Sequence, residues 1–123
     1  MSQHDFEIAN QTAANARTDI NNALQALASS SSGNSAPSTT YANQIWYDSS
    51  NNLLKIRNEA NSAWITVGEV DQTNSRFNPV IGDWKILLSS TSLIFQHSGT
   101  AKGKLESNGD LTVVGNVTAN GSI

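Results

Sequence analysis

The spacing of hydrophobic residues changes its character along this chain. In the first part, apolar residues recur at alternating spacings of three and four, which indicates a helical seam over three heptads. We therefore predict a helix from Asp5 to about Ala28, with Ser2 or Asp5 as its cap and Glu7 in its first turn. The apolar stripe, widened by Leu24, consists of Phe6, Ala9, Ala13, Ala16, Ile20, Ala23, Leu24 and Leu27.

This predicted helix needs a packing partner. Half of its stripe is alanine, which allows close approach but contributes little burial, and a helix of this length is marginal alone. It can associate in parallel with its own copies, dock into a groove of a larger partner, or fold back on the rest of the chain. The Ser-rich run 29–40, broken by Gly33 and Pro37, is typical of a flexible tether and favours an outward-reaching element.

Beyond residue 43 the pattern is that of short strands separated by turn residues. Segments 44–48, 53–57 and 63–67 predict a three-stranded meander, with Trp46 and Trp64 on neighbouring strands. The polar stretch from Asp71 to Gly82 contains breakers and predicts a second linker. Strand-like runs then resume at 84–88, 92–96 and 100–105.

A six-residue beat marks the last part of the chain. A glycine recurs every six residues, and an aliphatic residue follows each glycine two positions later. Such small units cannot bury their own apolar residue, so they are expected to stack against copies of themselves. A left-handed parallel β-helix also uses six-residue repeats, but it needs several coils. The four repeats of this chain make barely one coil, which disfavours that fold. The predicted shaft positions are Gly103, Leu105, Gly109, Leu111, Gly115, Val117, Gly121 and Ile123.

These patterns predict a mainly β fold with one N-terminal α-helix and elongated serial β modules. The expected division is an anchor helix at 1–32, a flexible linker at 33–43, a meander at 44–70, a second linker at 71–82 and a β shaft at 83–123.

Composition favours stability through assembly. Ser, Asn and Thr make up 42 of the 123 residues, 37% are hydrophobic and the net charge is only −3. The seven basic residues are scattered, so we expect no nucleic-acid surface. Cysteine is absent, which excludes disulfides and thiolate metal sites. Without an apolar leader or a long apolar run, the chain is expected to be made and assembled inside a cell, with no membrane insertion.

The residues that could carry chemistry do not predict a catalytic, metal or cofactor site. His4 and His97 have unrelated contexts, the serines occur in runs and turns, and the acids lie in or beside turns. We therefore expect no enzyme. Trp46, Trp64 and Trp84 allow two interpretations, an aromatic surface for glycan contact or core aromatics of small sheets.

Three segments of the sequence resemble the virion-proximal region of a bacteriophage tail fibre. They are the opening helix pattern from Asp5 to Leu27, the meander with Ile45-Trp-Tyr-Asp48 and Ala63-Trp-Ile65, and the terminal phrase 108–121. The resemblance implies a homotrimeric structural protein of the virion, assembled in the host cytoplasm. Its N-terminal helix would fasten it to a tail, hub or baseplate protein, and its β modules would project toward the host for adsorption.

The end of the chain departs from that pattern, because such fibres usually continue into a receptor-binding tip or a folding domain. The chain is then expected to be either a short fibre or a connector that another fibre protein extends. A separate alternative function is a small carbohydrate-binding module that uses exposed tryptophans. The partners implied are further copies of the chain, a tail or baseplate protein, and a distal fibre protein or a host surface glycan.

Overall fold

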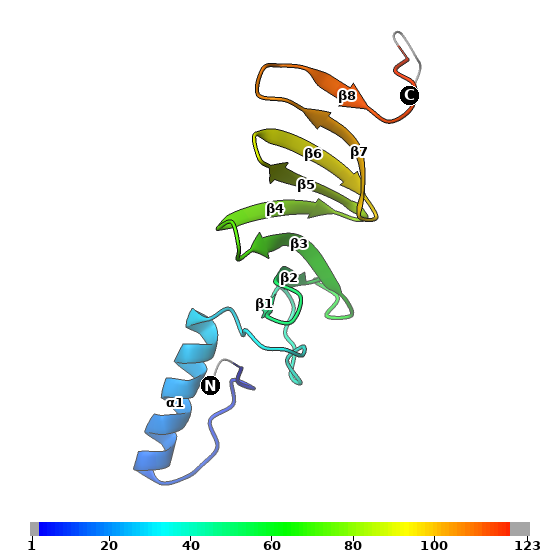
Figure 1. Ribbon diagram of the computed structural model, residues 1–123. Helices are drawn as coiled ribbons and strands as arrows, with labels where there is room; N and C mark the ends of the chain where they lie inside the picture. Colours follow the sequence, from blue (N-terminus) through cyan, green and yellow to red (C-terminus); the bar gives the residue numbers. More distant parts are fainter. Residues whose placement is uncertain (1–2, 119–123) are drawn as a thin grey trace.

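The computed structural model describes residues 3–118 and consists of one helix followed by an open, eight-stranded antiparallel sheet (Figure 1). The strands lie in the sheet in their chain order, so the sheet is a single-layer meander. Helix α1 lies at one end of the elongated molecule, and the last strand lies at the other end. The mainly β class with one N-terminal helix is thereby confirmed. The elements are α1 (Ala13–Ala28), β1 (Ile45–Asp48), β2 (Leu53–Arg57), β3 (Trp64–Asp71), β4 (Arg76–Ile81), β5 (Trp84–Ser89), β6 (Ser92–His97), β7 (Thr100–Leu105) and β8 (Leu111–Val113).

Helix α1 begins at Ala13, so the predicted start at Asp5 is wrong. Thr12 is the N-cap, and its side chain accepts a hydrogen bond from the backbone N–H of Asn15 at 3.4 Å. Residues 3–12, which we call the N-terminal arm, are not helical and return alongside α1 (Figure 1).

Local side chains explain why the arm is not helical. The backbone N–H of Phe6 donates to Nδ1 of His4 at 2.8 Å, and that of Glu7 donates to Oδ1 of Asp5 at 3.1 Å. These bonds offer the backbone an alternative to a first helical turn. Phe6 and Ala9, two residues of the predicted stripe, therefore lie outside the helix.

The segment after α1, predicted as a flexible linker, is hydrogen-bonded to the sheet where it begins. The N–H of Tyr47 donates to the carbonyl of Ser30, and Gly33 donates to the carbonyl of Tyr47, each at 3.1 Å. The N–H of Ser49 in turn donates to the carbonyl of Gly33. An edge strand leaves backbone groups that need partners, and this segment satisfies them on β1.

The predicted meander is present, but its tryptophans are not on neighbouring strands. Trp46 lies on β1 and Trp64 on β3, with β2 between them. Their side chains nevertheless project on the same face, since Trp46 pairs with Lys55, Trp64 pairs with Arg57, and these two partners lie two residues apart on β2.

The second predicted linker, 71–82, is wrong because it contains β4. The first part of β4 pairs with β3 up to the Gly68–Pro79 pair, and the second part pairs with β5 through Val80 and Ile81. Pro79 lacks an N–H, and it lies where the pairing passes from one neighbour to the other. A residue that suggests a break is thus accommodated inside a continuous sheet.

The core of the single chain is small. The buried hydrophobic residues within 3–118 are Ala26 and Trp46. A one-layer sheet lacks a second layer to cover its faces, and α1 extends beyond the β1 end of the sheet (Figure 1). Most apolar side chains of the strands are therefore half-buried or exposed.

Candidate functional site

The strand register places the charged side chains of the paired strands on one face of the sheet and most of the large apolar side chains on the other. Paired residues on neighbouring strands share a face, and residues alternate between faces along each strand. Following the pairs from β1 to β8 places eight charged residues on one side, which we call the polar face. They are Asp48, Lys55, Arg57, Glu69, Asp71, Arg76, Lys85 and Lys104.

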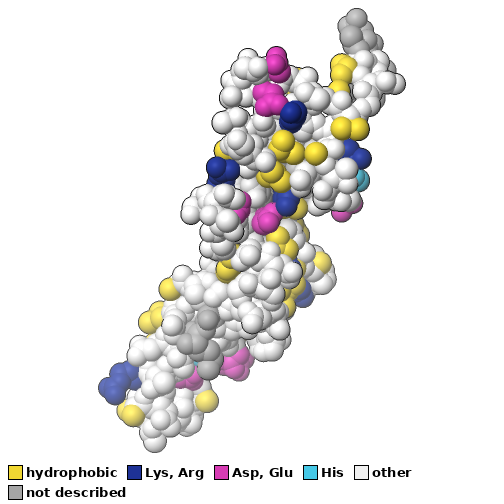
Figure 2. Space-filling model, viewed as in Figure 1, with side chains coloured by type: hydrophobic (Ala, Val, Ile, Leu, Met, Phe, Trp, Pro, Cys, Tyr) yellow, Lys and Arg dark blue, Asp and Glu magenta, His cyan; other side chains and the backbone are white. Residues whose placement is uncertain are grey.

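The opposite side, which we call the apolar face, carries a row of large hydrophobic residues along the whole sheet. Several are about half exposed, including Ile65 at 52% and Phe77 at 49%. Figure 2 shows exposed apolar side chains over the strand part of the molecule. By the same register, the face comprises Ile45, Tyr47, Leu54, Ile56, Ile65, Val70, Phe77, Pro79, Ile81, Trp84, Ile86, Leu88, Leu93, Phe95, Leu105, Leu111 and Val113.

An apolar surface of this extent is a candidate interface. Soluble monomers rarely expose contiguous apolar patches larger than a few hundred Å². A sheet whose apolar face is uncovered needs another layer for independent stability. The chain supplies no such layer within residues 3–118, so the apolar face is the leading candidate for a functional surface.

Trp46 and Trp64 form a cluster on the polar face. Their rings meet edge to face with centroids 5.2 Å apart. Lys55 lies over Trp46 at 4.6 Å and Arg57 lies over Trp64 at 5.3 Å, both measured to the ring centroid. Because Trp46 is only 5% exposed, it is a core aromatic and presents no open ring for stacking.

The third tryptophan does not join this cluster. Trp84 lies on the apolar face, 46% exposed, and its ring centroid is 5.0 Å from that of His97. The three tryptophans named by the sequence are therefore divided between opposite faces. They cannot act together as one aromatic surface.

A buried carboxylate supports the end of the tryptophan cluster. Asp48 accepts hydrogen bonds from the N–H of Ser50, from the backbone and side chain of Asn51, and from Nζ of Lys55 at 3.0 Å. Burial acts to raise the pKa of Asp48, but the hydrogen bonds from Asn51 and Lys55 outweigh it and lower the pKa below its ordinary value. The side chain is thus an ionised structural acceptor.

The helical part of the predicted anchor stripe is only partly covered by the rest of the chain. Ile20, Leu24 and Leu27 are exposed, and they follow one another at spacings of four and three on the helix surface. Ala16 and Ala23 are half-buried, whereas Ala13 is exposed at the start of the helix. The exposed large residues form a surface stripe that the chain itself leaves uncovered.

A hollow connects this helical stripe with the apolar face. It has a volume of about 470 Å³ and is lined by Phe6, Leu27, Tyr41 and Ile45, among others. The rings of Phe6 and Tyr41 meet edge to face with centroids 6.0 Å apart. Since Leu27 belongs to the stripe and Ile45 to the apolar face, apolar surface continues from the helix to the sheet.

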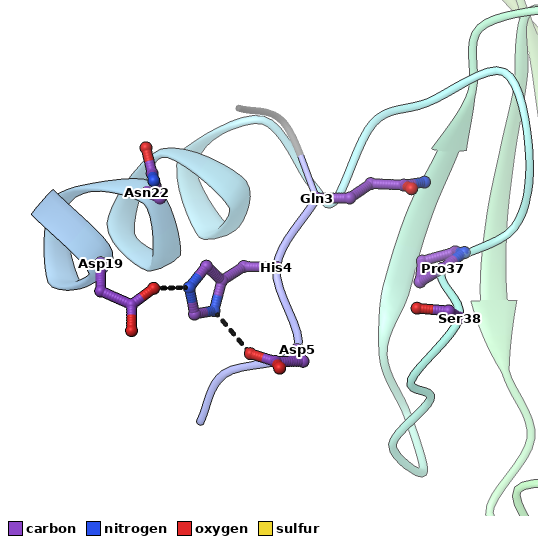
Figure 3. A pocket seen from close by; sticks show the side chains of 7 residues that line it. All are labelled: Gln3, His4, Asp5, Asp19, Asn22, Pro37 and Ser38. Carbon is purple, nitrogen blue, oxygen red and sulfur yellow. Dashed lines mark hydrogen bonds and ion pairs between the residues drawn. The ribbon is translucent and has the colours of Figure 1, made fainter. Parts of the chain in front are cut away.

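The N-terminal arm is held on the helix by a histidine that the sequence did not single out as structural. Nε2 of His4 lies 2.8 Å from Oδ1 of Asp19 in α1, and Nδ1 lies 3.3 Å from Asp5 (Figure 3). Because Nδ1 also accepts the N–H of Phe6, both ring nitrogens are engaged. Ser38 borders the same pocket, but His4 has no nitrogen left to activate it. His4 therefore holds the N-terminal arm against α1, and its ring is not arranged to act as a catalytic base.

The residues of the six-residue repeat do not occupy structurally equivalent positions in the described chain. Gly103 lies within β7 opposite Val113, whereas Gly109 lies in a turn with φ of +94°. Leu105 and Leu111, two units of the beat, are instead paired across one hairpin. Gly115 has φ of +112° and Val117 is exposed, while Gly121 and Ile123 lie outside the described residues.

Residues 3–118 contain neither a cluster of metal-binding side chains nor a helix able to span a membrane. His, Asp and Glu side chains form no group of three or more there that could hold a metal ion. Helix α1, with 16 residues, falls short of the length and apolarity that crossing a bilayer requires. Comparison of the chain with protein-family models, with curated proteins and with solved structures finds no match.

Proposed function

We propose that this chain is a structural component of a bacteriophage tail, the virion-proximal anchor and shaft of a homotrimeric tail fibre. The observation that carries the proposal is the uncovered apolar face of a single-layer sheet, which requires partners of matching length. Further copies of the same chain satisfy that requirement. The resemblance of the sequence phrases to tail fibres supplies the biological setting.

Strand length supports three copies around one axis. Strands β4 to β7 have six residues each, so a sheet of this kind is about 20 Å wide. Three such sheets forming a triangular prism place each backbone plane about 6 Å from the axis, close to half the usual sheet spacing of about 10 Å. Their side chains would fill the interior without a large void.

The same arrangement gives the helix its proposed role. Three parallel chains would bring their helices to one end of the assembly. The exposed residues Ile20, Leu24 and Leu27 of each helix would then form an apolar surface at that end. A tail, hub or baseplate protein is the proposed receptor for that end. The β part would then project away from the virion, directed toward the host or toward a distal protein that extends it.

Multi-angle light scattering on the purified chain tests the assembly. We expect a mass about three times the 13.1 kDa of a single chain, stable on dilution. A stable dimer would contradict the three-fold packing. A well-folded monomer would contradict the interface itself, since it would show that the apolar face tolerates water.

Deletion of residues 1–28 tests the anchor separately. This boundary removes α1 but retains Ser30 and Gly33, which complete the edge of β1. We expect the truncated chain to keep its oligomeric mass and to lose incorporation into the tail. Normal incorporation of the truncated chain would contradict the anchor role and leave the assembly proposal intact.

A further inference from the structure

An Asn-Gly pair occupies the last hairpin turn of the described chain. Asn108 and Gly109 lie between β7 and β8, and both are exposed. Gly109 has a φ of +94°, and the place that a Cβ would take is open space. The backbone nitrogen that follows the Asn108 side chain is therefore not shielded by a side chain of its own residue. A second Asn-Gly pair, at 120–121, lies outside the described residues.

Hydrogen bonds fold the side chain of Asn108 toward the peptide groups that follow it. Oδ1 accepts from the backbone N–H of Asp110 at 3.0 Å, and Nδ2 donates to Oδ2 of Asp110 at 2.7 Å. An asparagine that bonds two residues ahead in this way mimics a backbone turn. The N–H donor also polarises the side-chain carbonyl, as donors to a carbonyl oxygen do in acyl transfer. A carbonyl carbon prepared for attack is thus followed directly by an unshielded backbone nitrogen.

One hydrogen bond holds this nitrogen back. The N–H of Gly109 donates to the carbonyl of Glu106 at 3.0 Å, so the bond must open before the nitrogen can lose its proton and turn toward Asn108. Opening is favoured at this place, because β8 has only three residues, all of them exposed, and ends the sheet. Local opening costs least free energy where few buried apolar contacts hold a segment. The turn can therefore open while the remaining strands stay paired.

We propose that Asn108 is a site of spontaneous covalent modification, at which the side-chain amide is converted to a carboxylate. The backbone nitrogen of Gly109 attacks Cγ of Asn108 within the same turn. The new N–C bond replaces the bond from Cγ to Nδ2, and Nδ2 leaves as ammonia with the proton that Gly109 has lost. Water then opens the cyclic imide. The product is aspartate, or isoaspartate when the main chain runs on through Cγ.

Either product disturbs the turn that formed it. The aspartate product brings a second negative charge to Asp110, whose Oδ2 lies 2.7 Å from Nδ2 of Asn108 in the parent turn, and like charges at such a separation repel. The isoaspartate product adds one CH₂ group to the main chain between Glu106 and Asp110. The N–H of Glu106 donates to the carbonyl of Asp110 at 2.8 Å, and this bond closes the hairpin. The pairing of β7 with β8 is thereby weakened.

The modification acts at the end of the sheet that lies farthest from α1 (Figure 1). Leu105 and Leu111 are paired across the turn, and both belong to the apolar face. Loosening of β8 therefore withdraws ordered apolar surface from this end of the molecule and leaves β1 to β6 unchanged. The inference concerns one chain and its own turn, so it is independent of the tail-fibre proposal.

Peptide-mapping mass spectrometry of the full-length protein, incubated in mildly alkaline buffer, tests the site. We expect Asn108 to gain the mass of an amide-to-acid conversion about tenfold faster than Asn74. Asn74 is the internal control, since it lies exposed in the β3–β4 turn and donates to Asp71 at 2.8 Å, but Ser75 follows it in place of a glycine. Fragment-ion sequencing separates Asn108 from Asn120. Conversion of Asn108 no faster than that of Asn74 would overturn the proposal.

A variant and a change of buffer test the chemistry of the step. Asn108→Gln should remove the fast conversion, because its longer side chain would have to close a larger ring. The conversion of Asn108 should also slow in mildly acidic buffer, since the nitrogen of Gly109 must lose its proton to attack. A rate that is the same in both buffers would contradict attack by the backbone nitrogen.

A product mimic tests the consequence for the fold. Asn108→Asp should lower the hydrogen-exchange protection of the Glu106 and Val114 amides, which bond across the last hairpin, by about threefold or more. The matched control Asn116→Asp adds the same charge at an exposed position outside the turn and should leave that protection unchanged. Equal protection in Asn108→Asp and the parent chain would contradict the loosening of β8.

Discussion

At the scale of single residues, the ordered parts of this molecule depend on polar side chains that hold backbone turns. Asp48 ends β1 and accepts from the following turn, and Asp71 does the same after β3, where the hydrogen bonds from Asn74 lower its pKa. Such side-chain acceptors allow tight turns in a chain with few buried apolar groups. They also make stability dependent on the ionisation of carboxylates.

Replacement of Asp48 tests this dependence on charge. Because the folded pKa of Asp48 is lowered, its stabilisation is complete above about pH 5 and is lost as the pH falls through the folded pKa. Asp48→Asn should therefore cost about 2 kcal/mol at pH 7 and progressively less toward pH 3. Urea unfolding at fixed protein concentration measures the difference. Glu59→Gln, at an exposed turn position, should leave the free energy of unfolding nearly unchanged at either pH. If the loss of stability in Asp48→Asn stayed constant with pH, Asp48 would not stabilise the fold through its charge.

At the scale of elements, two kinds of side-chain hydrogen bond set the residue at which α1 begins. One kind caps the helix, and the other binds backbone N–H groups of the arm in a non-helical conformation. Thr12 caps the helix, and the side chains of His4 and Asp5 bind N–H groups of the arm. His4 then fastens the arm to Asp19. The helix and its arm therefore form one unit, although the arm itself is not helical.

Removal of the cap should loosen the first turn of α1. We expect Thr12→Ala to destabilise the helix by about 0.5–1 kcal/mol, since one N–H group loses its acceptor. Hydrogen exchange of the first-turn amides measures this as a fall in protection of about twofold to fivefold. Thr18→Ala is the matched control, because Thr18 bonds to the carbonyl of Ala14 within the helix and alanine favours that position. Equal effects of the two substitutions would argue against a capping role.

At the scale of the whole molecule, segregation of the two faces is the dominant property. Charged residues lie on one side of the sheet and most of the large apolar residues lie on the other, yet no second layer is present within residues 3–118. In the proposed assembly, further copies of the chain would cover the apolar side and contribute the rest of the core.

Adjacent substitutions on β3 test whether the apolar face is covered in the assembly. Ile65 is 52% exposed in one chain, so Ile65→Glu should leave the isolated fold intact. In an assembly it would bury a charge, and we expect light scattering to detect dissociation to the mass of a single chain. Thr66→Glu places the same residue on the polar face opposite Lys55 and should preserve the mass. Unchanged mass in both variants would exclude this face as an interface.

Much of the β part could be predicted from local sequence. Strands at 53–57, 92–96 and 100–105 were recognised because alternation and flanking turn residues act over only a few positions. The β4 strand was missed, since Pro79 suggests a break unless the neighbouring strands are known. The helix start was missed because a regular apolar spacing does not reveal that nearby side chains bind the backbone N–H groups.

The sequence by itself determined the mainly β class and the order of the helix and most strands, because propensity and periodicity are local properties. Only the tertiary structure decided which residues share a face, since one residue of register exchanges the two sides of a strand. It separated Trp84 from Trp46 and Trp64, paired Leu105 with Leu111, and joined Leu27 to Ile45 across a hollow. Those relations depend on contacts between distant segments, and the candidate surfaces consist of such contacts.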